Sequence, residues 1–138
     1  TARQFVRATL AQHLKADLLQ AYQDNLTPGK YSPDAQSAGK RALKNCALAY
    51  LVEWPDTATY ALAHTQYQEA ENMTDRIAAL NAMLHCSSAL DKAHRKTRKQ
   101  VLAHFYKEFE SKEQAIKWVA QQNEHPFLSM VIAGWHYE

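Results

Sequence analysis

The sequence has few glycine, proline or cysteine residues. Of its 138 residues, three are glycine and four are proline, whereas alanine, leucine, lysine, glutamine, glutamate and arginine recur throughout. Strong helix formers with so few breakers predict an all-α fold, and the length fits one helical domain spanning residues 1–138. The scattered Gly29, Gly39 and Gly134 form none of the glycine-rich loops that hold phosphates or dinucleotides.

The two cysteines, Cys46 and Cys86, do not form the closely spaced pair of a metal or redox motif. We expect them to be buried as small apolar side chains in a reducing compartment, although a single disulfide stays open as an alternative. A nucleophilic role would need a nearby histidine. His85, His94 and the two cysteines are the only such set that folding could bring together.

The chain also lacks a strong net charge and a long apolar run. Sixteen basic and 14 acidic residues leave a formal charge of +2, which is too small to attract polyanions in general. No segment approaches the roughly 20 apolar residues of a membrane span, and the first residues do not resemble a signal peptide. We therefore expect a soluble, cytoplasmic protein that binds neither nucleic acid nor membrane.

One local exception is a basic run that we interpret as a solvated helix face. A nucleic-acid patch is the alternative, although the basic residues alternate around the helix and aromatic residues begin only afterwards. The run consists of Lys92, His94, Arg95, Lys96, Arg98 and Lys99.

Hydrophobic periodicity and capping residues predict six or seven helices. Thr1, Asp56 and either Asn72 or Thr74 are candidate N-caps, and Ser32 is the expected cap before Pro33 and Asp34. Short connections favour antiparallel hairpins, arranged as an α-solenoid of the HEAT or armadillo kind or as a compact bundle. The expected helices cover about residues 2–24, 33–53, 56–70, 72–86, 97–109 (starting as early as 89) and 112–122, with a short apolar segment at 127–135.

The same periodicity predicts which faces are buried. The first helix should bury a continuous stripe made of Phe5, Val6, Thr9, Leu10, His13, Leu14, Asp17, Leu18, Ala21 and Tyr22. For the next three helices we expect the core to include Leu43, Ala47, Leu48, Tyr50, Leu51 and Val52, then Tyr60, Ala61, His64 and Tyr67, then Ile77, Leu80 and Leu84. Trp54 and Trp135 fall outside this spacing, as residues that contact another part of a larger protein would.

The seven histidines prompt a search for a metal site. His13 with Asp17 and His104 with Glu108 are spaced to share a helix face, but a site needs three or four converging ligands. There is no His-Glu-x-x-His, Glu-x-x-His or Cys-x-x-Cys motif. We therefore assign no catalytic, cofactor-binding or metal-binding residue to this chain.

Two segments carry a family resemblance. One is Arg-Ala-Leu-Lys-Asn at residues 41–45 with Leu-Ala-Tyr-Leu at 48–51, and the other is Glu-Asn-Met-Thr-Asp at 71–75 with Ala-Ala-Leu at 78–80. Together they resemble the C-terminal helical domain of aminopeptidase N family zinc metallopeptidases. The likeness extends from about residue 2 to residue 122, and the last residues depart from the family pattern.

The resemblance implies a stack of helical hairpins that covers a catalytic domain and limits which peptides reach its zinc. In such enzymes, which remove N-terminal residues from peptides, the zinc ligands and the general base lie upstream of this domain. The implied partners are the remaining domains of the peptidase and the peptide substrates of the whole enzyme. The alternative is a stand-alone helical-repeat module that binds a protein or peptide in a groove.

Overall fold

A computed structural model describes residues 1–54, 56–85 and 91–108 of the chain. Within these residues it contains helices and no strand, as the composition predicts. The expected helix at 112–122 and the apolar segment at 127–135, with Trp135, lie outside the described residues. The helices are α1 (Ala2–His13), α2 (Lys15–Asp24), α3 (Ala35–Leu51), α4 (Thr57–Glu69), α5 (Met73–Leu84) and α6 (Asp91–Glu108).

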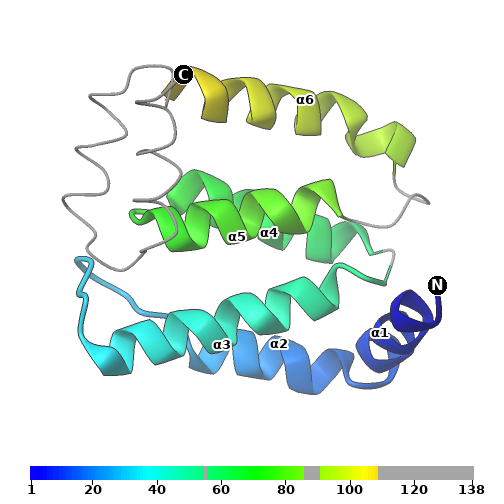
Figure 1. The fold of residues 1–138 in the computed structure, drawn as a ribbon, viewed down its shortest axis with the longest axis horizontal. Coiled ribbons are helices and arrows are strands. Elements are labelled where there is room, and N and C mark those ends of the chain that lie inside the picture. The colour runs from blue at the N-terminus through cyan, green and yellow to red at the C-terminus, as the bar shows by residue number, and fades with distance from the viewer. Residues whose placement is uncertain (55, 86–90, 109–138) are drawn as a thin grey trace, which may run out of the picture.

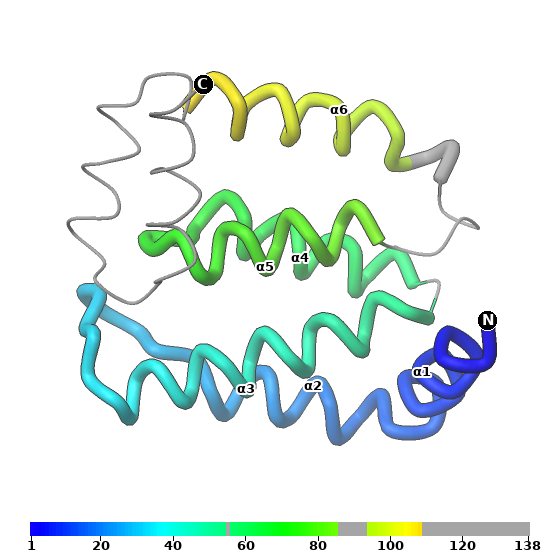
Figure 2. The backbone as a smooth tube through the Cα atoms, viewed as in Figure 1, coloured from blue at the N-terminus to red at the C-terminus, as the bar shows by residue number. Residues whose placement is uncertain are grey.

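The helices form successive antiparallel layers (Figure 1). The α2/α3 hairpin, the α4/α5 hairpin and α6 follow one another from the bottom to the top of the view, and α1 lies beside the C-terminal end of α3 (Figure 2). Each layer contacts the next, since α3 packs against α5 and α5 against α6. This order of layers is that of a helical solenoid.

Most helix starts follow from local capping chemistry. The Thr1 hydroxyl accepts a hydrogen bond from the Gln4 amide, and the side chains of Asp56 and Asn72 cap α4 and α5 in the same way. The expectation for Ser32 was wrong, because Asp34 is the cap of α3 and accepts from the Ser37 amide at 2.9 Å. Its hydrogen bond with the Ser32 hydroxyl, together with those from Ser37, holds the Asp34 pKa well below its usual range.

The first helix is interrupted, which periodicity did not predict. α1 ends at His13 and α2 begins at Lys15, with φ −106° and ψ 18° at Leu14 between them. No proline or glycine marks the break. The bend brings the Arg7 side chain to α3, where its Nη2 donates to the Ala49 carbonyl at 3.2 Å.

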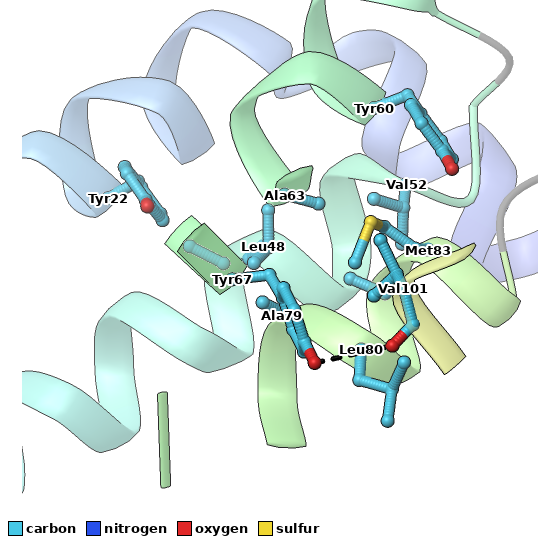
Figure 3. Close-up of a cluster of buried hydrophobic side chains, with 12 residues drawn as sticks. Tyr22, Leu48, Val52, Tyr60, Ala63, Tyr67, Ala79, Leu80, Met83 and Val101 are labelled. Carbon is cyan, nitrogen blue, oxygen red and sulfur yellow. Dashed lines mark hydrogen bonds between the residues drawn. The ribbon is translucent and has the colours of Figure 1, made fainter. Parts of the chain in front are cut away.

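The core lies where the two hairpins and α6 meet (Figure 3). Small alanine side chains at the centre of the cluster let the helices approach closely. The buried cluster contains Tyr22, Ala47, Leu48, Val52, Tyr60, Ala63, Tyr67, Ala79, Leu80, Ala82, Met83 and Val101.

Several predicted core residues are not buried. Leu43 is 52% exposed because α3 turns its Arg41 and Lys44 side inward, and Leu84 is 39% exposed because α5 buries Ala79, Ala82 and Met83 instead. Ala61 is exposed, and Tyr50, His64 and Ile77 are only half-buried. In α1 the predicted stripe largely faces outward, since Phe5, Val6, Leu10 and His13 are all exposed. Leu14, which follows α1, and Asp17 in α2 are exposed as well.

Candidate functional site

The most elaborate polar arrangement in the described residues is a buried network between the two hairpins. At its centre the Lys44 ammonium on α3 lies 2.8 Å from the Asp75 carboxylate in the first turn of α5, and these side chains are only 6% and 8% exposed. Asn45 Nδ2 donates to the other carboxylate oxygen at 2.8 Å. Asn72, the cap of α5, donates to the same oxygen as Lys44 at 3.0 Å. The Asp75 carboxylate thus accepts hydrogen bonds from three side chains.

The network continues across α4 to α2. Gln66 Nε2 donates to the Asn45 side-chain oxygen and to the Asp75 carbonyl, both at 2.9 Å. Its oxygen accepts from the Tyr22 hydroxyl at 2.7 Å. Burial, with smaller contributions from Asp75 and Glu69, raises the Tyr22 pKa to about 12, so the hydroxyl remains a donor at neutral pH. Four helices are therefore joined through one polar path.

Beside this network, Arg41 anchors the connection between α2 and α3. Its Nη2 donates to the Ser32 carbonyl at 2.9 Å, and the guanidinium lies over the Tyr31 ring. The connection turns at Gly29, whose φ of +96° favours glycine. Residues of this connection line a cavity of about 510 Å³, which Arg41 and Lys44 also line.

A second cavity, of about 630 Å³, lies between α4 and α6, with Arg76 of α5 also in its lining, and it exposes more apolar than polar surface. The Tyr67 hydroxyl lies 3.0 Å from His104 Nδ1 and donates to the Val101 carbonyl at 3.3 Å. Burial raises the Tyr67 pKa. Arg76 on α5 forms an ion pair with Glu108 at the end of α6. This cavity is lined by His64, Tyr67, Gln68, Arg76, Thr97, Gln100, Val101 and His104.

The histidine pairs do not build a metal site in the described residues. The break at Leu14 separates His13 from Asp17, and both are exposed. His104 Nδ1 lies 3.9 Å from Glu108, but it is also engaged by Tyr67. Across residues 1–54, 56–85 and 91–108, no three histidine, cysteine or acidic side chains are grouped to hold a metal ion.

The cysteine and histidine set is not assembled either, as far as the described residues extend. Cys46 is free and exposed, so the prediction that it is buried was wrong. The side of α3 that is buried carries Arg41, Lys44 and Leu48. His94 on α6 stacks on Tyr60, with ring centroids 3.8 Å apart. The α4/α5 layer lies between α6 and α3, which carries Cys46 (Figure 1). His85 is exposed, and Cys86 lies outside the described residues.

The basic run lies on α6. Arg95, Lys96 and Lys99 are exposed, whereas Arg98 is half-buried and has interactions of its own. In the described part of the chain no helix combines the length and apolar character that crossing a membrane requires.

Sequence reasoning identified Asn72 and Asp75 as a helix start but missed the pairing of Asp75 with Lys44. A signal was present in the sequence: Arg41 and Lys44 share the stripe that continues into Leu48 and Leu51, so two cations lie on the face that the apolar residues bury. A buried lysine needs a partner carboxylate.

Comparisons with known proteins agree with this architecture. The family described as "Domain of unknown function (DUF3458_C) ARM repeats" matches residues 1–131. The aminopeptidase N of Escherichia coli is 35% identical over 92 residues, which cover 64% of this chain and 10% of that protein. The aminopeptidase N of Caulobacter vibrioides is 29% identical over 126 residues, covering 91% of this chain and 14% of that protein.

The chain thus spans a small part of the length of the curated relatives that it matches. No match was found among solved structures. The matched residues include the hairpins and the polar network between them. The chain therefore belongs to the DUF3458_C family of ARM-repeat domains, the C-terminal helical domain of the aminopeptidase N family.

Proposed function

We propose that this chain is a non-catalytic helical part of a zinc aminopeptidase, with a structural role and a role in controlling access of peptides to the active site. The catalytic zinc would be held by another domain of the same enzyme. Support comes from the family and from the names of the two relatives. The whole enzyme's partners would be peptides from which it removes N-terminal residues.

The observation that carries the structural role is the way the buried polar groups are used. The Asp75 carboxylate, the Gln66 amide and the Tyr22 hydroxyl bind one another or their neighbours within the fold. Such a network fixes the relative position of α2, α3, α4 and α5. Rigid layers of this kind suit a wall that limits the size of a substrate chamber.

The first experiment tests the absence of a catalytic centre. The purified 138-residue chain is analysed for bound zinc and for hydrolysis of an aminoacyl substrate, with the whole enzyme as the positive control. We expect neither stoichiometric zinc nor turnover. Either result, if it survived removal of contaminating peptidase, would overturn the proposal.

The second experiment tests access control in the whole enzyme. Tyr22→Phe removes the hydrogen bond to Gln66 and loosens the contact between hairpins without altering a charge. We expect kcat/KM to change for a long peptide but not for a single aminoacyl substrate. Equal changes for both substrates would contradict a role in access.

A stand-alone interaction module remains the second candidate, favoured by the cavity of about 630 Å³ between α4 and α6. The reading frame of the gene discriminates the two. A coding sequence that continues upstream into a domain with His-Glu-x-x-His supports the peptidase, whereas a start codon next to Thr1 supports the module.

A further inference from the structure

The cavity between α4 and α6, which we call the α4/α6 cavity, has two walls of similar composition. On α4 its lining residues His64, Tyr67 and Gln68 share one face, because they are three and four positions apart. The wall on α6 has the same helical spacing, and Arg76 of α5 completes the lining. The residues on α6 are Thr97, Gln100, Val101 and His104.

The buried part of this lining is already satisfied. Tyr67 and Val101 are only 4% and 6% exposed. The Tyr67 hydroxyl donates to the Val101 carbonyl (Figure 3) and lies 3.0 Å from His104 Nδ1. Tyr67 and Val101 therefore offer a ligand apolar surface rather than a hydrogen bond.

Four other polar side chains of the lining are not engaged by the fold. They are half-buried or exposed, and within residues 1–54, 56–85 and 91–108 none of them forms a side-chain hydrogen bond or an ion pair. Two of them are glutamine amides, one on each helix, and such an amide both donates and accepts. The four are His64, Gln68, Thr97 and Gln100.

The α4/α6 cavity offers no unpaired permanent charge in the part of its lining that the structure describes. Arg76 is the one lysine, arginine or acidic residue there, and it forms an ion pair with Glu108. Its guanidinium also lies over the Tyr67 ring. A charged ligand finds no counter-charge in such a site, whereas a neutral ligand that carries both donors and acceptors finds partners on both walls.

A peptide main chain is a ligand of this kind, because each residue presents one N–H donor and one C=O acceptor. A sugar is neutral as well, but the larger apolar share of the exposed lining favours a peptide. We propose that the α4/α6 cavity binds the main chain of a peptide substrate, with Gln68 and Gln100 as its hydrogen-bonding groups. This inference rests on the proposed function, in which the whole enzyme acts on peptides.

The dimensions of the site indicate how much of the peptide it holds. From Thr97 to His104 the wall on α6 is about 10 Å long. An extended chain advances about 3.3 Å per residue, so the wall matches a segment of about three residues. The volume of about 630 Å³ lies within the usual range of small-ligand sites. Because the contacts go to the main chain, the site accepts peptides of varied sequence.

The test is a titration of the ¹⁵N-labelled chain with acetyl-trialanine amide, an uncharged peptide of the expected length, followed by NMR. We expect saturable shifts at residues that line the α4/α6 cavity, with a dissociation constant on the order of 1 mM. The same peptide with N-methylated main-chain amides lacks the donors and should bind at least about five-fold more weakly. Equal binding of the two peptides, no saturable shift, or shifts confined to α1 and α2 would overturn the inference.

Matched variants assign the binding to the two amides. Gln68→Ala and Gln100→Ala should each raise the dissociation constant about five-fold, the effect of one lost hydrogen bond. Gln23→Ala, at an exposed position of α2, is the control and should leave it unchanged. Dissociation constants equal to that of the control would overturn the assignment.

A second measurement asks whether the bound peptide is a substrate. In the whole enzyme, Q68A/Q100A should lower kcat/KM for a long peptide relative to that for a single aminoacyl substrate by at least about five-fold. Gln23→Ala should leave this ratio unchanged, and an unchanged ratio in Q68A/Q100A would overturn the role in substrate binding. Zinc or turnover in the isolated chain would instead overturn the proposed function and leave the titration result standing, so the two failures are distinguishable.

Discussion

Substitution of the Lys44 and Asp75 pair tests the polar network most directly. Asp75→Ala removes the carboxylate that accepts from Lys44, Asn45 and Asn72, and it leaves an ammonium in a site where the lysine side chain is 6% exposed. Breaking a buried pair by removing one partner costs about 3–5 kcal/mol. Because Asn45 and Asn72 lose their acceptor as well, we expect the upper end, about 5 kcal/mol.

Lys44→Met should cost less, at about 3 kcal/mol. The long apolar side chain retains the packing of the lysine stem, and Asp75 keeps its hydrogen bonds from Asn45 and Asn72. Because a chain of this size has a total stability of about 5–15 kcal/mol, either loss is large enough to measure. The free energy of unfolding is obtained from urea titrations followed by circular dichroism.

A double-mutant cycle separates the pair from its surroundings. The double variant K44M/D75A should be more stable than the sum of the single losses predicts, because no buried charge is left without its partner. Lys99→Met, at an exposed position of α6, is the control and should change stability by less than about 0.5 kcal/mol. Additive single effects, or a loss for Asp75→Ala no larger than that of the control, would refute the network as a source of stability.

Three further predictions concern separate parts of the fold. Tyr22→Phe should lower the free energy of unfolding by about 1–2 kcal/mol in urea titrations, because Gln66 loses a buried donor. The folded-state pKa of Asp34 is lowered, so its stabilisation of α3 is fully present above the ordinary value of 3.8 and is lost as the pH falls through the folded-state pKa. Carboxyl NMR titration should show that low pKa, with Asp34→Asn as the control. Fluorescence anisotropy at physiological salt should show no binding of the chain to nucleic acid. The contrary result would be binding whose affinity falls steeply with salt and is lost when glutamine replaces Arg95, Lys96 and Lys99.

Local chemistry accounts for what the sequence predicted well. A cap such as Thr1, Asp56 or Asn72 acts through hydrogen bonds within three residues along the chain, so its effect is visible before the tertiary fold is known. The all-α class and the hairpin order depend on the same short-range signals, and both are confirmed. The family resemblance at residues 41–51 and 71–80 is confirmed by the match over residues 1–131.

Burial was less predictable because it depends on where neighbouring helices lie. Phe5 and Leu10 have the spacing of a core stripe, yet the bend at Leu14 lets Arg7 and Ala11 face α3 instead. Leu43 is exposed for a related reason, since α3 buries two cations beside its leucines. Periodicity identifies an apolar face, but it does not say whether that face is covered by this chain or by another part of a protein.

Asp75 shows how a local motif and a tertiary contact can use the same residue. Its backbone amide donates to the Asn72 side-chain oxygen, a capping contact that the sequence predicts. Its carboxylate accepts from Lys44, 31 positions earlier on α3, a contact that the sequence alone does not predict. Capping of α5 by Asn72 fixes the position at which the carboxylate enters the interface between hairpins. A shift of this helix start by one residue would rotate Asp75 by about 100° around the helix and break the network. The cap therefore sets the register of the two hairpins. A segment with the sequence of a simple helix start thus also determines how the layers of the solenoid are joined.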